Sequence, residues 1–176
     1  MARYTTEEEV RLLIKYAKLA NIGIVEIGVL DGETTKEISK HVTLPIYGID
    51  PIIPDSMFDT LIGSEELINK NMGNYPNFNF YKDYSYNVVK NFAYPFDYIF
   101  IDGDHNYSAV KKDFNDWFEL IEVGGYILFH DSDCVESIKT DFKGWEGCIK
   151  LVKELKNDKR VKWLERVDTI NVFIKI

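Results

Sequence analysis

Cysteine, basic charge and long apolar runs are all scarce in this chain, and each shortage excludes a class of protein. Only two cysteines occur among the 176 residues, Cys134 and Cys148. They have neither the spacing of metal ligands nor the surroundings of a nucleophile. Disulfide frameworks are typical of secreted proteins, so we expect two free thiols in a cytoplasmic protein.

The shortage of basic charge argues against a nucleic-acid partner. The chain has 29 acidic and 21 basic residues, which gives a formal net charge of −8 at pH 7. Proteins that bind the phosphate backbone normally carry a basic stripe. The densest basic segment, Lys150 to Lys162, alternates with leucine, valine and glutamate, as on a solvated helix face. We therefore expect no binding to nucleic acid.

The apolar runs are too short for a membrane-spanning helix, which needs about 20 apolar residues. The first nine residues also lack the apolar core of a secretory signal. From the sequence we therefore expect neither membrane insertion nor secretion, in agreement with a cytoplasmic location.

What the chain does have is a regular alternation of apolar runs and amphipathic segments. Its length suits one domain over residues 1–176. Short apolar runs are typical of parallel strands that are buried on both faces of a sheet. Amphipathic segments between them predict helices. Five runs are predicted as strands: residues 22–27, 46–49, 78–81, 98–101 and 126–129.

The last part of the chain predicts an antiparallel hairpin. Residues 161–167 and 170–176 have the pattern of two strands joined by a tight Asp168–Thr169 turn. Before the fifth strand, we expect the pair Gly124–Gly125 to end a helix and introduce the strand. The predicted fold class is α/β, a mostly parallel sheet with helices on both faces and an antiparallel C-terminal hairpin.

The segment from Phe96 to Phe114, FDYIFIDGDHNYSAVKKDF, combines an apolar strand, a polar turn and the start of an amphipathic helix. Asp102 follows the apolar run, so it should lie at the carboxyl end of a buried strand, where open α/β sheets bind ligands. Asp131 ends the next strand in the same way. If the strands are neighbours, both carboxylates can converge on one divalent cation such as Mg²⁺. Alternatively, one acid caps a helix and the other pairs with a lysine.

The segment VEIGVLDGETT, residues 25–35, predicts a ligand-binding turn after the first strand. The carboxylate of Glu26 is costly to bury unless it is paired, and the ammonium group of an amino acid would pair it. A bond from a neighbouring backbone amide is the alternative. Gly28 and Gly32 flank the turn, where a missing Cβ lets the backbone approach a ligand. The segment does not match G-x-G-x-x-G, so a dinucleotide is not expected.

Two further polar residues follow the next two strands. Asp50 ends the second strand, a position where an acid accepts both hydrogens of a ribose diol. Its alternative role is that of a helix cap or turn residue. Ser85 follows the third strand, where it can either reach the edge of an adenine or cap a helix.

Together with YGID and GGYILFHDSD, these segments resemble the class I S-adenosylmethionine-dependent methyltransferases. More narrowly, they resemble the metal-dependent O-methyltransferases, such as the catechol and macrolide-sugar enzymes. The resemblance covers roughly Ile22 to Asp133 and the terminal hairpin. It implies a Rossmann-like seven-stranded sheet with the last strand antiparallel, S-adenosylmethionine as cofactor, and a small hydroxylated acceptor.

The resemblance also implies which residues bind the cofactor. Glu26 and Gly28 would lie at the methionine moiety, with Thr34 near its carboxylate. Asp50 would hold the ribose, and Ser85 would lie beside the adenine. The full implied set is Glu26, Gly28, Thr34, Asp50, Ser85 and Asp102.

In the same family, two metal-ligating acids stand at the positions of Asp102 and Asp131. The third ligand is an Asn or Asp directly after the second acid, whereas this chain has Ser132. We expect Asp133 to serve in its place. His130 should point to the opposite face, because side chains alternate along a strand. Given this departure from the family, a metal-free relative is an alternative.

His105 follows Asp102 by three residues and matches the catalytic base of the family. A neutral imidazole can accept an alcohol proton near pH 7. Desolvation beside a cation would favour this neutral form. The alternative is a turn histidine that caps the helix at Asn106. Asp104 would either orient His105 or cap the same helix.

The acceptor is expected to be a hydroxyl of a small molecule, such as a sugar or a catechol. Its pocket walls should come from residues 133–145, the stretch after Asp50, and Tyr107. Trp145 would either stack on a substrate ring or pack in the core. Because the chain has little beyond a minimal core, the pocket is either open or completed by a second subunit of a homo-oligomer.

Three other functions share parts of this pattern. A nucleotide-sugar-binding transferase would use Asp102-Gly103-Asp104 as a D-x-D metal site, but the edge near Gly28 is acidic rather than basic. An NAD-dependent oxidoreductase would need the missing third glycine. A non-catalytic cofactor-binding module would not need its acids and His105 intact. The sequence therefore favours an O-methyltransferase.

Overall fold

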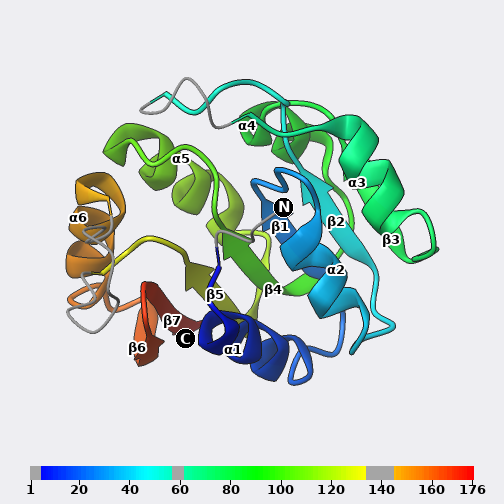
Figure 1. Ribbon diagram of the computed structural model, residues 1–176. Coiled ribbons are helices and arrows are strands. Elements are labelled where there is room, and N and C mark those ends of the chain that lie inside the picture. Colours follow the sequence, from blue (N-terminus) through cyan, green and yellow to red (C-terminus); the bar gives the residue numbers. More distant parts are fainter. Residues whose placement is uncertain (1–4, 57–61, 134–144) are drawn as a thin grey trace.

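The computed structural model describes residues 5–56, 62–133 and 145–176. These residues form a three-layer α/β structure (Figure 1). In chain order the elements are α1 (Glu7–Ala17), β1 (Ile24–Ile27), α2 (Glu33–Ser39), β2 (Ile46–Ile49), α3 (Glu65–Met72), β3 (Phe78–Tyr81), α4 (Ser85–Val88), the 3₁₀ turn η1 (Val89–Asn91), β4 (Phe96–Ile101), α5 (Tyr107–Phe118), β5 (Ile121–Phe129), α6 (Glu146–Leu155), β6 (Val161–Val167) and β7 (Ile170–Lys175).

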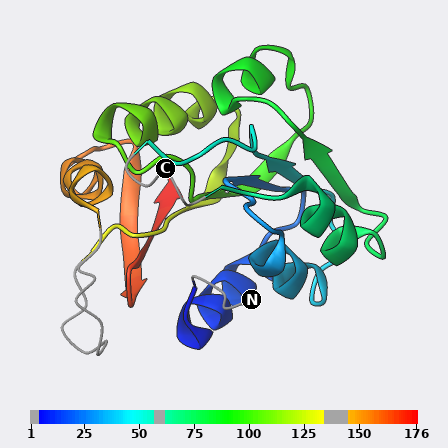
Figure 2. The same cartoon turned by 45° about the horizontal axis from the view of Figure 1, so that its top comes forward.

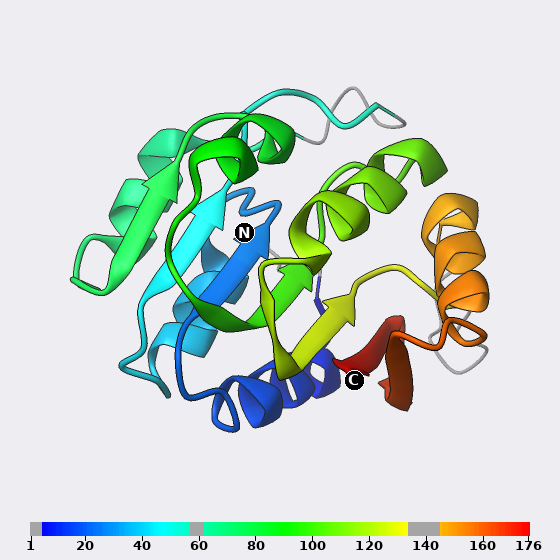
Figure 3. The ribbon, with the colours of Figure 1, turned by 180° about the vertical axis from the view of Figure 1, so that it is seen from behind.

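The described strands join one sheet in the order β3-β2-β1-β4-β5-β7-β6. Strands β1 to β5 are parallel, and their arrows run the same way in Figure 3. Strand β7 runs antiparallel to both β5 and β6, so the predicted hairpin and mixed sheet are confirmed. The strand order reverses between β1 and β4, and ligands bind at such a switch point, outside the carboxyl ends of the strands.

Helices cover both faces of the sheet (Figure 2). Helices α4, α5 and α6 lie on one face, and α1, α2 and α3 lie on the other. Alternate residues of β1 supply the two cores: Val25 and Ile27 pack under the first set, and Ile24 packs under the second. Both faces of the central strands are buried, which explains why their sequences are apolar without alternation. Among the described helices, none combines the length and apolarity that a bilayer-spanning segment needs.

The glycine pair before the fifth strand has a different role from the one expected. Helix α5 already ends at Phe118, and Gly124 and Gly125 lie inside β5. Gly124 has a φ of +84°, and a Cβ on Gly125 would lie 2.7 Å from Ile121 Cγ2. The expectation that the pair ends a helix was therefore wrong. The glycines permit an irregularity in the strand, beside the register shift in its pairing with β4.

Candidate active site

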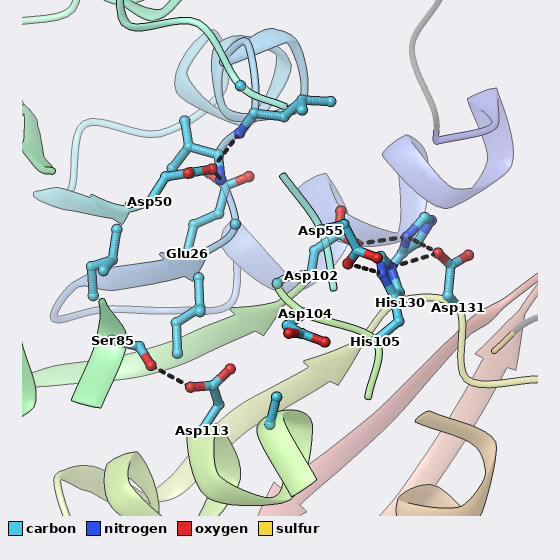
Figure 4. A pocket seen from close by; sticks show the side chains of 18 of the residues that line it. Glu26, Asp50, Asp55, Ser85, Asp102, Asp104, His105, Asp113, His130 and Asp131 are labelled. Atoms are coloured by element: carbon cyan, nitrogen blue, oxygen red, sulfur yellow. Dashed lines mark hydrogen bonds and ion pairs between the residues drawn. The ribbon is translucent and has the colours of Figure 1, made fainter. Parts of the chain in front are cut away.

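A cavity of about 820 Å³ opens where the parallel strands end. This volume is in the range of sites that hold a small ligand or a cofactor. Figure 4 shows that acidic and polar side chains from several strand ends surround it. The predicted site residues that line the cavity are Glu26, Gly28, Thr34, Asp50, Ser85, Asp102, His105 and Asp131.

Glu26 brings a buried carboxyl group to the cavity from β1. The residue is only 2% exposed, and among the described residues its Oε2 has no hydrogen-bond partner. The alternative partner, a neighbouring backbone amide, does not reach this oxygen. Burial raises the pKa of Glu26 to about 8, and the negative charges of Asp102 and Asp50 act in the same direction. The carboxyl is therefore mostly protonated at pH 7, and a cation in the cavity would stabilise its ionised form.

Asp50 uses most of its carboxylate to brace the neighbouring turns. Its Oδ2 accepts hydrogen bonds from the N–H groups of Val29 and Leu30, both at 2.9 Å. Its Oδ1 accepts one from the N–H of Ile52 at 2.7 Å. A carboxylate has about four acceptor positions, so roughly one is left for a ligand. The expected contact of Asp50 with both hydroxyls of a ribose stays a prediction, with about one acceptor position left open for it.

Gly28 and Thr34 border the same end of the cavity. Gly28 has a φ of +88°, and a Cβ there would lie 2.0 Å from the backbone oxygen of Asp102. The close approach that requires this glycine is therefore made by the chain after β4, not only by a ligand. Thr34 lies in the first turn of α2, with its Oγ1 3.2 Å from Thr5 Oγ1.

Ser85 begins α4, and its hydroxyl donates a hydrogen bond to Oδ1 of Asp113 on α5. The N-cap of α4 is Tyr84, so the alternative of Ser85 as a helix cap was wrong. Both Ser85 and Asp113 are buried, and both line the cavity.

Six charged side chains meet beside the cavity, and we call them the acid–histidine cluster; Figure 4 labels all of them except Glu9. They come from α1, from the loop after β2, and from the segments that follow β4 and β5. Strands β4 and β5 are parallel neighbours, as the pairing of the two acids required. The cluster comprises Glu9, Asp55, Asp102, His105, His130 and Asp131.

His105 is held between two carboxylates. Its Nδ1 lies 2.9 Å from Asp55 Oδ2, and its Nε2 lies 3.0 Å from Asp131 Oδ2. Asp104 does not orient this ring, because its Oδ1 accepts a hydrogen bond from the N–H of Asn106 and braces the turn. Asn106 itself is the N-cap of α5, so His105 is free of the capping role that was its alternative.

The surroundings of His105 decide its charge. Burial lowers the pKa of His105, but the hydrogen bond to Asp131, the charges of Asp102 and Asp131, and the hydrogen bond to Asp55 together raise it to about 9. In these surroundings His105 carries a proton at pH 7, and the neutral form expected beside a bound cation stays a prediction. To act as a base, it must first lose this proton.

His130 bridges the two acids at the strand ends. Its Nδ1 lies 2.9 Å from Asp102 Oδ1 and 3.4 Å from Asp131 Oδ2, while its Nε2 lies 3.5 Å from Glu9 Oε2. The expectation that His130 points away from the acids was wrong. His130 and Asp131 follow Phe129, the last residue of β5, and Asp131 has a φ of +51°. The alternation of side chains along a strand therefore no longer applies to them.

Electrostatics tie His130 and the two acids together. Burial lowers the pKa of His130, but the charges and hydrogen bonds of Asp102 and Asp131 raise it well above its ordinary value. Burial opposes ionisation of Asp131, but the two histidines outweigh it and lower the pKa of this carboxyl. For Asp102, burial prevails and raises the pKa. The histidines therefore supply the positive charge that keeps the acids together.

The start of α6 fixes the turn that carries His105. A Cβ on Gly147 would lie 2.3 Å from His105 O and 2.4 Å from Tyr107 N, so the helix packs directly on this turn. The ring of Trp145 lies 5.0 Å from the His105 ring, and its backbone N–H donates to Asp131 O at 2.9 Å. Trp145 is half-buried against the imidazole at the edge of the cavity. The remaining expected pocket wall, residues 134–144, is outside the described residues.

One part of the cluster has the composition of a metal site. Asp102, His105 and Asp131 each offer one ligand atom, and these atoms lie within 4.8 Å of one another. Asp133 is not in this group, and its Oδ2 lies 3.2 Å from Arg166 Nη1. Among the described residues, the third member of this group is His105, whereas the sequence led us to expect Asp133.

Comparison with known proteins decides the family of the chain. A family model described as a methyltransferase domain matches residues 25–132. The chain belongs to this methyltransferase family. An uncharacterized protein of Acanthamoeba polyphaga mimivirus is 32% identical over 117 residues, which are 61% of this chain and 50% of that protein. The methyltransferase chain thus spans about half the length of that relative.

Solved structures show the same fold. The O-methyltransferase TomG from Streptomyces achromogenes, in complex with S-adenosylmethionine, matches 97% of this methyltransferase and 81% of its own chain, with a TM-score of 0.68 and 16% identity. An O-methyltransferase from Bacillus cereus, in complex with S-adenosylhomocysteine, matches 99% and 84%, with a TM-score of 0.66 and 19% identity. The predicted α/β methyltransferase fold is therefore confirmed.

Sequence reasoning missed three members of the cluster in this methyltransferase: Glu9, Asp55 and His130. Glu9 had a local signal, because Thr6 and Glu9 form a capping box at the start of α1. The capping box accounts for only some of the contacts that Glu9 makes. Its Oε1 also accepts hydrogen bonds from the N–H and hydroxyl of Thr169 at 2.9 and 2.6 Å. Asp55 lies in an irregular loop and had no signal of its own.

Glu9 should stabilise this methyltransferase in a pH-dependent way. Burial alone would raise the pKa of Glu9, but His130, Thr169 and Thr6 outweigh it and lower the pKa from 4.5 to about 2. A lowered folded-state pKa means that the stabilisation is present above pH 4.5 and is lost as the pH falls toward 2. We expect Glu9→Gln to reduce the free energy of unfolding at pH 7 by about 2–3 kcal/mol.

Urea unfolding of both proteins at pH 7 and at several acidic pH values measures this difference. The exposed Glu7 on the same helix, which pairs with Arg11, provides the matched control. Glu7→Gln should change stability by about 0.5 kcal/mol or less. A Glu9→Gln deficit that stays constant down to the most acidic pH would contradict this account of the cluster.

Proposed function

We propose that this chain is an S-adenosylmethionine-dependent O-methyltransferase, acting as a single domain on a hydroxyl of a small molecule. The observation that carries the proposal is the buried carboxyl of Glu26, whose Oε2 has no partner among the described residues and which lines the same cavity as Asp50 and Ser85. S-adenosylmethionine offers an ammonium group, ribose hydroxyls and an adenine, which complement these three residues in turn. The cofactors in the solved structures of the same fold support this choice.

In this proposal the chain first positions the cofactor. Glu26 ionises and pairs with the ammonium group, while Thr34 lies near the carboxylate of the methionine moiety. The remaining acceptor position of Asp50 takes one ribose hydroxyl. Asp102, next to Gly28 across the close backbone contact, borders the methionine end of the cofactor. This order along the cavity would direct the methyl group toward the acid–histidine cluster.

His105 is the proposed catalytic base. Its Nε2 takes the proton of the acceptor hydroxyl as the oxygen attacks the sulfonium methyl carbon. The new O–C bond forms while the C–S bond breaks, and the sulfur keeps the electron pair as S-adenosylhomocysteine. Because His105 is a cation in the free protein, it must lose a proton beforehand, and the positive sulfonium favours this loss. Asp55 at Nδ1 and Trp145 on the ring hold the imidazole in place.

The cluster also fits a divalent cation, which we propose as a second cofactor. Carboxylate oxygens, with water completing the coordination, suit Mg²⁺ or Mn²⁺. Asp102 and Asp131 would hold the ion, and His105, as the base, would stay beside it without coordinating it. When bound, such an ion would lower the pKa of the acceptor hydroxyl. The alternative is a metal-free reaction in which His130 keeps its place between the two acids.

For the acceptor, we propose a chemical class and no particular molecule. A sugar hydroxyl suits the histidine base, and a catechol suits the pair of acids. A nucleotide-sugar transferase is less well supported, because Asp104 of the D-x-D segment is bonded to Asn106 and Ser56. A homo-oligomer that completes the acceptor pocket stays a prediction, as does the absence of nucleic-acid and membrane partners.

Cofactor binding should release a proton. Because the pKa of Glu26 is about 8, its carboxyl carries most of a proton at pH 7 and must lose it to pair with an ammonium group. Titration calorimetry with S-adenosylhomocysteine, in buffers of different ionisation enthalpy, should show the release of nearly one proton. Glu26→Gln should abolish this release and weaken binding by about 10-fold or more.

Glu37→Gln is the control, since Glu37 lies on α2 outside the cavity and pairs with Lys40. It should bind like the wild type. Tight binding without proton release, unchanged in Glu26→Gln, would exclude the proposed role of Glu26. Binding of NAD or a nucleotide sugar in place of S-adenosylhomocysteine would favour one of the other functions.

Metal binding can be measured without turnover. The free protein is titrated with Mn²⁺, and the loss of the electron paramagnetic resonance signal of the free ion reports binding. We expect wild-type binding that Asp131→Asn weakens by about 10-fold or more, because a coordinating charge is lost. Asp133→Asn should have no effect, because Asp133 pairs with Arg166. An equal loss in both variants would restore Asp133 as a ligand. No binding to the wild type would exclude the metal.

A further inference from the structure

The cavity has a second buried carboxyl that the proposed reaction does not use. Asp113 lies on α5, is 8% exposed and lines the cavity. Ser85 donates a hydrogen bond to its Oδ1. The other oxygen, Oδ2, has no hydrogen-bond partner among the described residues and lies near Gly103, 3.6 Å from the place of a Cβ on that residue. In Figure 4 this oxygen is turned away from Ser85 toward the cavity.

A purely structural role explains only half of this arrangement. The bond between Ser85 and Asp113 ties the start of α4 to α5, but a neutral asparagine would accept the same bond. Instead the position holds an acid that is costly to bury. Burial, with the nearby charges of Asp116 and Asp104, raises the pKa of Asp113 to about 6, so the group is still mostly ionised at pH 7. An ionised oxygen that borders the cavity and has no partner among the described residues is stabilised by a hydrogen-bond donor on a ligand.

The position of Asp113 identifies the part of the ligand that it would meet. Glu26 lies on the central strand β1, Asp50 ends the neighbouring β2, and Ser85 follows the outer β3. If the methionine end of the cofactor lies at Glu26 and the ribose at Asp50, the base lies at Ser85 and Asp113. This step rests on the proposed function. Adenine presents an exocyclic amine with two donor hydrogens, whereas hypoxanthine presents an oxygen that cannot donate.

We propose that Asp113 determines the specificity for adenine: Ser85 holds one carboxylate oxygen, and the other accepts a hydrogen bond from the exocyclic amine. A base with a keto oxygen at that position would place two acceptors against each other without a proton between them. A site built to accept a donor rejects such an analogue because its buried polar group is then left unpaired.

The test compares S-adenosylhomocysteine with S-inosylhomocysteine, which carries the keto oxygen in place of the amine, by titration calorimetry. We expect the wild type to bind the adenosyl compound about 10- to 100-fold more tightly. Asp113→Asn keeps the shape and the acceptor for Ser85 but presents an NH₂ group to the base. This variant should lose the preference or reverse it.

Asp116→Asn is the matched control, because it removes the same charge from the same helix at a residue that does not line the cavity and pairs with Lys112. It should keep the wild-type preference. The wild-type measurement needs no variant, so equal binding of both compounds to the wild type overturns the proposal even if Asp113→Asn does not fold.

The remaining outcomes distinguish the role of Asp113 from the assignment of the cofactor. A wild-type preference that Asp113→Asn leaves unchanged removes Asp113 as its source, while the cofactor assignment stands. If the wild type binds neither compound, the proposed function fails, and the role of Asp113 fails with it.

Discussion

Mutual repulsion among buried carboxylates at the ends of the parallel strands is the constraint on which this site depends. The molecule relieves it in three ways. Backbone N–H groups surround Asp50, the imidazolium of His130 bridges Asp102 and Asp131 while that of His105 contacts Asp131, and Thr6 and Thr169 enclose Glu9. Glu26 and one oxygen of Asp113 are left without such partners, so they are the groups that await a ligand.

The fold produces this crowding because it joins distant parts of the chain at one edge of the sheet. The β1 turn and the segment after β4 touch at Gly28, which leaves no room for a side chain. Helix α6 presses on the His105 turn through Gly147, and α1 reaches the far side of His130 through Glu9. Each histidine is therefore oriented by an element that lies outside the strand–turn–helix unit that carries it.

The sequence was sufficient to predict the five parallel strands and the terminal hairpin, because buried strands are apolar without alternation. It also indicated the polar residues after β1, β2, β4 and β5 that line the cavity: Gly28, Asp50, Asp102 and Asp131. It could not show His130 beside Asp102, since the left-handed backbone of Asp131 breaks the alternation. Nor could it show Glu9, whose bonds to Thr169 span 160 residues of sequence. The charge of His105 depends on Asp131 and Asp102 and, to a smaller extent, on Asp55, which no local pattern marks. A cytoplasmic location stays a prediction.

A crystal structure of the protein with S-adenosylhomocysteine tests the central claim most directly. The account predicts that the ammonium group of the ligand contacts Glu26 and that the sulfur faces the acid–histidine cluster, with the base between Ser85 and Asp113. A ligand bound outside this cavity, or bound in it with the sulfur turned away from His105, would contradict the account.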